Sequence, residues 1–222
     1  MLLAIDTATR QTSLALYDQS RVIAETSWET RANHTVELMP QIARMLDDAR
    51  VDKKDLRAIA VSTGPGGFTG LRVGISVAKG LAWSLRVPLI GISALDALAH
   101  AFAEQPLVIW AMLVAGRNRL AVAKYFPTNH RVTRAGDLML LDPTSLVELA
   151  ASENARALFC GDLDRTLEEN LRARLGDRAV IGSPAPNARR AALIAQLAWA
   201  RLERAEFDDV SALAPIYLSQ KI

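Results

Sequence analysis

The chain opens with MLLAIDTATRQTSLALYDQSRVIAETSW, residues 1–28, and this stretch decides the predicted fold. Its three apolar segments are separated by short polar turns, which predicts an antiparallel meander of three strands over 2–5, 12–17 and 22–28. A helix follows, with Asn33 as its predicted N-cap and a kink predicted at Pro40. Its apolar residues recur at spacings of three and four, and the predicted buried face consists of Val36, Met39, Ala43 and Leu46.

Strands and helices then alternate. The pattern predicts a strand over 58–62, a glycine loop, a helix over 71–86, a strand over 88–92 and a helix over 93–103. The order βββαβαβα joins an antiparallel start to parallel crossovers, so residues 1–104 are predicted to form a ribonuclease-H-like lobe of the α/β class.

The pattern restarts after Gln105 and Pro106, so residues 105–222 are predicted to form a second, reduced lobe. Strands are expected over 107–115, 120–126, 138–141, 157–160 and 179–181. Helices are expected over 144–152, 163–175 and 187–206. The last helix and the apolar tail over 212–218 are expected to pack back on the first lobe.

Composition bounds the class of protein. With 222 residues, 50% of them hydrophobic and 23% charged, the chain can bury one large core or two small ones. Its 26 basic and 24 acidic residues do not suit a basic nucleic-acid-binding domain. One basic stretch fits either a solvated strand face or a phosphate-binding surface, and it contains Arg117, Arg119, Lys124, Arg131 and Arg134.

Targeting and redox signals agree with a cytoplasmic location. Cys160 is the sole cysteine, so a disulfide within the chain is excluded and a reducing compartment fits. The longest apolar run, 107–115, is far shorter than the ~20 residues that span a bilayer and predicts a buried strand. The N-terminus has no basic region or cleavage-like site, so we expect neither a signal peptide nor a membrane partner.

Two polar loops are the candidates for ligand binding. The glycine loop over 64–70 lies between a strand and a helix, where backbone N–H groups can hold an anion, but it equally fits a tight connection. Asp6 and Thr7 end the first strand, and their polar groups fit either phosphate and metal binding or ordinary turn bonds. The candidate nucleotide or phosphate residues are Asp6, Thr7, Thr9, Gly64, Gly66, Gly67 and Thr69.

The sequence lacks the motifs of two common classes of hydrolase, zinc proteases and serine hydrolases. The three histidines, His34, His100 and His130, have no pair at helical spacing, and Leu38 stands four residues after His34. A zinc protease helix needs two histidines at that spacing, so we predict no metal site and exclude a metalloprotease. No Gly-x-Ser-x-Gly motif is present either, so the local signature of a serine hydrolase is missing.

The helix over 71–86 carries small residues at every fourth position, Gly74, Ala78 and Ala82. Such a row allows close approach of another helix, either within the chain or from another subunit. The same helix is apolar nearly all round, which favours an interface, and the helix over 34–49 extends that surface.

Together these motifs closely resemble the TsaB family, also called YeaZ. The resemblance rests on Asp6 to Thr9, the run 33–40, the run 62–74 and the run 78–82, in this order and spacing, and on Ala214-Pro-Ile-Tyr-Leu218 in the tail. It implies an actin-like, sugar-kinase-like ATPase fold of two ribonuclease-H-like lobes, the second reduced.

The resemblance also implies a function. TsaB proteins are non-catalytic and pair with the catalytic subunit TsaD, which transfers threonylcarbamoyl to the adenosine beside the anticodon of ANN-decoding tRNAs; the ATPase TsaE completes the machinery. The chain is then expected to form homodimers, to meet tRNA through the complex, and to bind no cofactor alone, with ATP or ADP in the assembly. The expected interface residues are His34, Leu38, Met39, Leu71, Gly74, Ile75, Ala78 and Ala82.

This sequence departs from the family pattern at several places. Gly67 replaces a serine of the loop, and residues 115–121 keep only Arg117 of an Asp-Ala-Arg motif. The resemblance also implies that TsaD has a second metal-binding histidine where this chain has Leu38, which agrees with the predicted absence of a metal site. An alternative reading is a small ATP-using enzyme of the sugar-kinase type. Against it, no acid pair or lysine stands where a base and a phosphate clamp are needed.

Overall fold

The computed structural model describes residues 1–30 and 34–218, which form two compact units. Unit 1 contains Met1–Ala94 and Arg189–Ile216; unit 2 contains Leu95–Ala188 and the end of the chain from Tyr217. The expected boundary after residue 104 therefore differs from the observed division, because helix α3 (Ala94–His100) packs on the second sheet. There the Tyr125 hydroxyl donates to Asp96 of α3 at 2.7 Å.

The sheet of unit 1 has the strand order β3-β2-β1-β4-β5. The predicted antiparallel meander is confirmed for β1 (Leu2–Asp6), β2 (Gln11–Asp18) and β3 (Arg21–Glu29). Strand β4 (Ala58–Gly64) pairs in parallel with β1 and with β5 (Leu89–Ser93). The carboxyl ends of β1 and β4 consequently meet at one edge of the sheet.

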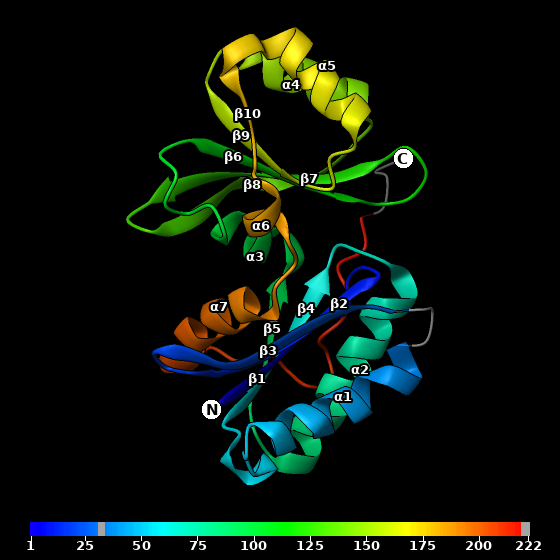
Figure 1. Cartoon of the computed structure of the whole chain (residues 1–222), viewed down its shortest axis with the longest axis vertical. Helices are drawn as coiled ribbons and strands as arrows, with labels where there is room; N and C mark the ends of the chain where they lie inside the picture. The colour runs from blue at the N-terminus through cyan, green and yellow to red at the C-terminus, as the bar shows by residue number, and fades with distance from the viewer. Residues whose placement is uncertain (31–33, 219–222) are drawn as a thin grey trace. The chain divides into compact units, whose positions relative to one another are not determined.

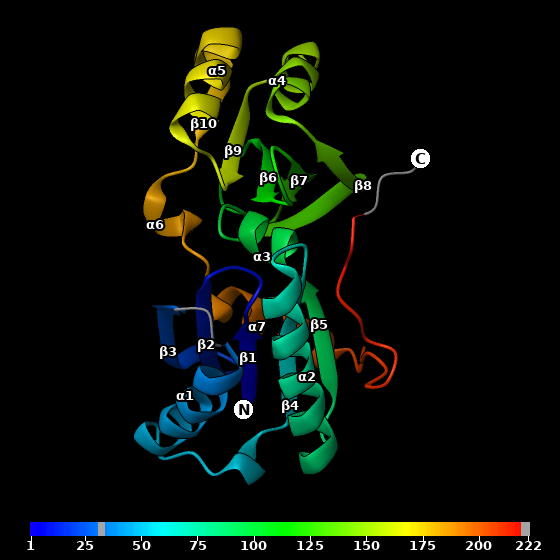
Figure 2. The ribbon, with the colours of Figure 1, turned by 90° about the vertical axis from the view of Figure 1, so that its right-hand side faces the viewer.

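Helices cover both faces of this sheet (Figures 1 and 2). Helices α1 (His34–Asp48) and α2 (Phe68–Leu85) lie on one face, and α7 (Ala191–Glu203) lies on the other. Side chains alternate along a strand, so Leu3 and Ile5 of β1 enter the core under α1 and α2. A short 3-10 turn, Lys53–Asp55, connects α1 to β4.

The buried face of α1 differs from the predicted one. Leu38, Ile42 and Met45 enter the core, whereas Val36 and Met39 are 66% and 45% exposed. Both sets have helical spacing, so periodicity alone could not choose between two apolar stripes on one helix. The predicted N-cap, Asn33, lies outside the described residues.

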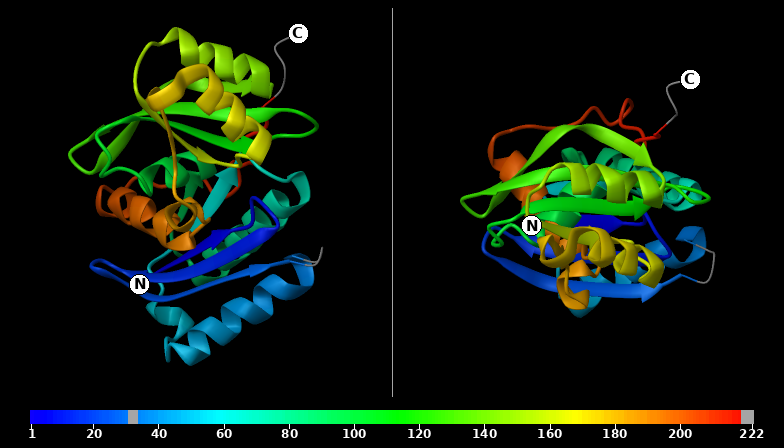
Figure 3. Two further views of the ribbon diagram at one scale, coloured as in Figure 1. Left: turned by 45° about the horizontal axis from the view of Figure 1, so that its top comes forward. Right: turned by 90° about the horizontal axis from the view of Figure 1, so that it is seen from above.

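The sheet of unit 2 has the order β10-β9-β6-β7-β8. Its strands are β6 (Val108–Val114), β7 (Leu120–Thr128), β8 (Arg131–Leu141), β9 (Ala157–Gly161) and β10 (Ala179–Ile181). Helices α4 (Pro143–Ser152) and α5 (Arg165–Leu175) cover one face together (Figure 3). The run 107–115 is confirmed as a buried strand, β6, and forms the centre of this sheet.

Two elements of the second half differ from the prediction. Strand β8 begins at Arg131 rather than at residue 138, because its polar first half pairs with β7 and gives no hydrophobic signal. The helix predicted over 187–206 is confirmed as α7 but begins later, at Ala191, and a separate short helix, α6 (Pro184–Asn187), precedes it. Residues between them are extended, since Arg189 and Arg190 reach acidic partners in unit 1.

The C-terminal segment of unit 1 follows the outer edge of β5. The Asp208 backbone N–H donates to the Leu89 carbonyl at 2.9 Å, and the Gly91 N–H donates to Asp208 Oδ2 at 2.8 Å. Further on, the Ile216 N–H donates to the Thr63 carbonyl at 2.8 Å. The edge strand β5 is thereby covered. Within the described residues, no helix is both long and apolar enough to cross a bilayer.

Candidate functional site

The two polar loops predicted from the sequence do lie together, at the carboxyl ends of β1 and β4. They contact each other directly: the Gly67 N–H donates to the Ala8 carbonyl at 2.6 Å, and a Cβ on Gly66 would overlap that carbonyl. The Gly64–Pro65 peptide bond is cis. Gly66 and Gly67 therefore allow the glycine loop to pack closely against the first loop.

The threonine hydroxyl groups of the first loop form hydrogen bonds with backbone carbonyls. The Thr7 hydroxyl donates to the Gly70 carbonyl at 2.8 Å, and the Thr9 hydroxyl donates to the Gln11 carbonyl at 3.1 Å. The Ala8 N–H donates to Asp6 Oδ1 at 3.0 Å. The Asp6 and Thr9 bonds are local turn bonds of the kind that the sequence allowed as the alternative to phosphate binding, whereas the Thr7 bond joins the first loop to the glycine loop. Thr69, at the start of α2, is exposed.

Asp6 has a partner that sequence reasoning missed. Arg189 Nε and Nη2 donate to Asp6 Oδ2 at 3.0 and 2.6 Å, and the two side chains are only 8% and 3% exposed. The two residues are far apart in the chain, so no local signal connects them. A guanidinium thus occupies the place where a cation would meet this carboxylate, and these residues do not fit a metal-bound phosphate group.

Further polar groups gather on this face of the sheet. Ser13 pairs with Asp6 across β2 and β1, and Ser62 follows Val61, the strand partner of Ile5. The hydroxyls of Ser13 and Ser62 and Nη1 of Arg189 are buried and without a hydrogen-bond partner in the described chain. Metal-ligating side chains do not cluster: residues 1–30 and 34–218 hold no group of three or more that could bind an ion.

Most of the expected interface residues lie in the core of unit 1. Six of the eight are buried: Leu38, Leu71, Gly74, Ile75, Ala78 and Ala82. A Cβ on Gly74 would overlap the Thr7 hydroxyl, so the glycine at this position lets α2 pack on the first loop of its own chain. His34 is half-buried, with Nε2 3.4 Å from the Thr9 carbonyl oxygen. Only Met39 stands clearly on the surface.

A different set of residues on the same helices faces outward. We call it the outer helical face, and it consists of Val36, Met39, Phe68, Gly80 and Trp83. Trp83 is 76% exposed and Phe68 is 55% exposed, with the Arg72 guanidinium 3.5 Å above the Phe68 ring centre. Nothing lies within 4 Å of a Cβ placed on Gly80. The exposed apolar side chains of this set lie on two helices that contact each other, α1 and α2.

The basic stretch of unit 2 does not form one surface. Lys124 pairs with Glu153, and Arg134 lies 3.8 Å from Asp96. In the pairing of β7 with β8, Lys124 is opposite Ala135 and the next residue, Tyr125, is opposite Arg134. Paired residues share one side of a sheet and successive residues alternate, so Lys124 and Arg134 lie on opposite faces of the sheet. Burial and the neighbouring Asp96 carboxylate raise the pKa of Tyr125, which therefore stays a neutral donor.

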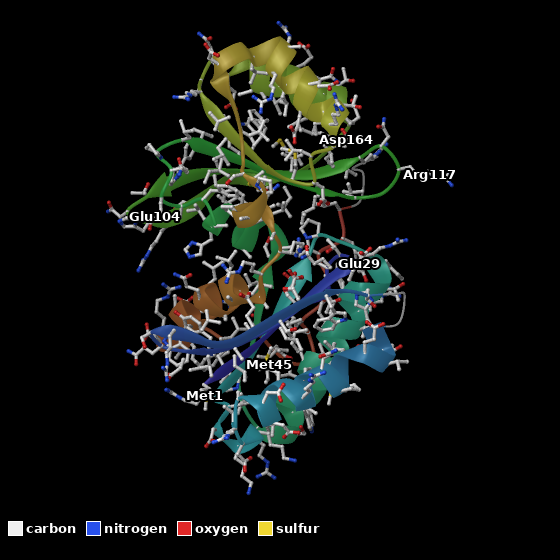
Figure 4. The ribbon with its side chains drawn as sticks, in the orientation of Figure 1. Met1, Glu29, Met45, Glu104, Arg117 and Asp164 are labelled. Carbon is white, nitrogen blue, oxygen red and sulfur yellow. The ribbon has the colours of Figure 1, made fainter. Side chains whose placement is uncertain are left out.

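The divergent segment 115–121 forms a tight hairpin turn between β6 and β7. The Ala115 N–H donates to the Arg119 carbonyl at 2.9 Å, and Gly116 and Asn118 have φ of 107° and 52°. Glycine and asparagine tolerate this backbone conformation best, which explains their presence here. Arg117 projects from the tip of the hairpin (Figure 4).

Comparison with known proteins relates both sequence and fold to one group. The family model described as "TsaD: tRNA N6-adenosine threonylcarbamoyltransferase" matches residues 22–171. The chain is 32% identical over 220 residues to the tRNA threonylcarbamoyladenosine biosynthesis protein TsaB of Bacillus subtilis, covering 98% of this chain and 93% of the relative. The protein of the same name from Escherichia coli is 40% identical over 99 residues, 45% of this chain and 42% of the relative.

Solved structures give the same picture. YeaZ from Pseudomonas aeruginosa superposes with a TM-score of 0.77 at 27% identity, covering 98% of this chain and 99% of that one. The ROK hexokinase from Thermus thermophilus superposes with a TM-score of 0.54 at 13% identity, covering 91% and 99%. The second likeness concerns the fold alone, and it confirms the predicted actin-like, sugar-kinase-like class.

Proposed function

Because the chain belongs to the TsaB family, we propose that it acts in tRNA threonylcarbamoyladenosine biosynthesis as a non-catalytic subunit that supports TsaD. The observation that carries this proposal is the match to a TsaB protein over 98% of the chain. The complex modifies the adenosine next to the anticodon of ANN-decoding tRNAs in the cytoplasm, with TsaE as its ATPase. This chain meets tRNA as part of that assembly.

The lack of catalysis is supported by the chemistry of the two loops. Asp6 is neutralised by Arg189, and the Thr7 and Thr9 hydroxyls donate to backbone carbonyls. A sugar-kinase-like enzyme needs a free carboxylate for its metal and donors for phosphate at this edge. We therefore propose that this chain alone binds no nucleotide, and that ATP or ADP enters the complex through its partners.

The outer helical face is the proposed binding surface for TsaD and for a second copy of this chain. The matched TsaD family model spans residues 22–171 and so includes both α1 and α2. A two-fold contact uses the same patch on both partners, so a related protein with the same helices can replace the second copy. Met39 and Trp83 supply the flexible and aromatic anchors typical of such interfaces.

Depletion of the protein in its own host tests the function. We expect threonylcarbamoyladenosine in digested bulk tRNA to fall as the protein disappears, while other modified nucleosides stay constant as the control. Re-expression of the wild-type chain should restore the nucleoside. A constant level throughout depletion would refute the proposal. ATP turnover by the purified chain alone would then support the sugar-kinase-type alternative.

A further inference from the structure

Unit 2 holds a pocket of about 730 Å³ that the proposed function does not explain. It lies where the 3-10 turn Gly176–Arg178 leads from α5 into β10. Three arginines line it: Arg156, Arg172 and Arg178. Figure 2 shows α5 above β9 and β10 at this end of the sheet.

Pairing of the strands brings two of these arginines together. Arg156 immediately precedes β9 and Arg178 immediately precedes β10, and the two strands are parallel with Ala157 opposite Ala179. Adjacent strands lie about 4.8 Å apart, so the register places two like charges side by side. The third, Arg172, is on the last turn of α5 beside Leu171, which is buried under the helix.

The charges in this pocket are poorly compensated. Within the part of the chain that the structure describes, the guanidinium groups of Arg156 and Arg172 form no ion pair and no hydrogen bond. Arg178 donates only to neutral acceptors, the Ala151 carbonyl at 3.5 Å and Asn154 Oδ1 at 3.2 Å. Asp177 is the one carboxylate in the lining, so three guanidinium groups face a single acid.

Other arginines of the same helix behave differently. Arg165 pairs with Glu169 at 2.8 Å, and Arg174 pairs with Glu148 at 3.1 Å. The partial negative charge at the end of α5 accounts for cations in its last turn, Arg172 included. It does not account for Arg156, which precedes a strand, or for the register that places Arg156 beside Arg178.

The backbone adds a second feature. Strand β10 is at the edge of the sheet, and all three of its residues line the pocket. The Ala179 N–H donates to the Gly176 carbonyl, and the outer side of the strand has no strand partner among the described residues. Arginine binds phosphate through paired N–H donors, and free backbone N–H groups can add to such a contact. The chemistry of the pocket therefore suits phosphate oxygens.

We propose that this arginine pocket binds phosphate groups of an RNA backbone, and that the chain contacts tRNA directly through it. The choice of tRNA rests on the proposed function; the choice of phosphate rests on the pocket. Because backbone contacts carry no sequence information, the pocket positions RNA without selecting it. Free inorganic phosphate offers the same chemistry, and the experiment separates the two sources.

Binding of an unmodified tRNA transcript to the purified full chain tests this inference by fluorescence anisotropy. The test variant is Arg156→Gln/Arg172→Gln, which leaves Arg178 and its hydrogen bonds intact. The matched control is Arg165→Gln/Arg174→Gln, which removes two charges from unit 2 outside the pocket. We expect the test variant to bind tRNA about tenfold more weakly. The slope of the logarithm of the binding constant against the logarithm of the salt concentration should become shallower by roughly one unit per lost phosphate contact.

The control variant should bind tRNA within about twofold of wild type at the same salt concentration. Equal weakening by both variants would show a general charge effect and overturn the proposal, as would no weakening by either. Binding of inorganic phosphate is measured by 31P line broadening. If the test variant binds phosphate more weakly but binds tRNA as tightly as wild type, the site holds a small anion and the RNA proposal fails. Threonylcarbamoyladenosine loss on depletion is scored separately, so failure here leaves the proposed function standing.

Discussion

At the scale of single residues, Asp6 shows how one long-range contact changes the interpretation of a motif. The acid at the end of the first strand fitted metal binding or turn chemistry when only the sequence was considered. Its geometry includes both a turn bond to Ala8 and a buried ion pair with Arg189. The second contact could not be predicted, because 183 residues separate the partners and arginine is common in this chain.

Replacement of Arg189 with methionine should destabilise unit 1 strongly. The substitution keeps most of the apolar volume but leaves the Asp6 carboxylate buried without its partner, so we expect a loss of about 3–5 kcal/mol. Urea denaturation followed by circular dichroism measures it. The double variant Asp6→Asn/Arg189→Met should recover a large part of the loss. A single variant within about 1 kcal/mol of wild type would show that the ion pair contributes little.

Two glycines on α2 make a matched pair for a packing test. Gly74 lies against the Thr7 hydroxyl, whereas the space around Gly80 is open. Gly74→Ala should therefore destabilise the protein by about 1–3 kcal/mol through overpacking. Gly80→Ala should stabilise it by up to about 1 kcal/mol through helix propensity. Thermal unfolding of both variants checks the signs, and equal shifts would contradict the assigned packing.

At the scale of elements, α1 and α2 have two sides with different roles. Their inner residues seat them on the sheet, and their outer residues form the outer helical face. The sequence predicted an interface on these two helices, and six of the eight residues that it named for the interface are buried within unit 1. Each helix carries more than one apolar stripe, and only the position of the sheet decides which stripe is buried.

The exchange of Trp83 for glutamate tests the outer helical face. Trp83 is 76% exposed, so the stability of the isolated chain should change by less than about 0.5 kcal/mol. A charge in the centre of an apolar contact should nevertheless abolish homodimers in sedimentation and capture of TsaD in a co-purification. Unchanged association in both assays would refute this surface.

Ala78→Glu is the complementary control. Ala78 is fully buried within unit 1, so this substitution should unfold the chain rather than disrupt a surface. A folded Ala78→Glu variant that has lost only its partner binding would instead place the interface on the row of small residues.

At the scale of the whole chain, the fold class and the return of the last helix to the first lobe were predictable, whereas the bounds of the two units were not. The apolar periods of β1 to β5 and their order define the first sheet, and the structure confirms them. Helix α7 and the segment after it belong to unit 1, as expected, after an excursion of the chain through unit 2. The bond between Tyr125 and Asp96 of α3 is a long-range contact without a local signal, so the sequence placed the first boundary after residue 104 rather than after Ala94.

The return of the chain to unit 1 also closes an edge that would otherwise be exposed. Asp208 bonds both Leu89 and Gly91 of β5, and Arg201 of α7 donates to the Gly91 carbonyl at 2.9 Å. Open edges of apolar strands pair with other chains and lead to aggregation. The segment after α7 therefore covers the outer edge of β5.

Truncation after Glu206 should convert this edge into a site of self-association. The shortened chain keeps α7 but loses Asp208 and the segment that reaches Thr63, so the outer groups of β5 become free to pair. We expect concentration-dependent oligomers in size-exclusion chromatography with light scattering. A chain ending at Leu218 is the control and should behave as the full-length protein does. Adding Trp83→Glu to the truncated chain separates the two surfaces. We expect the oligomers to persist, because the strand edge and the helices are separate surfaces of unit 1. Dissociation of the oligomers into monomers would show that the outer helical face alone drives association.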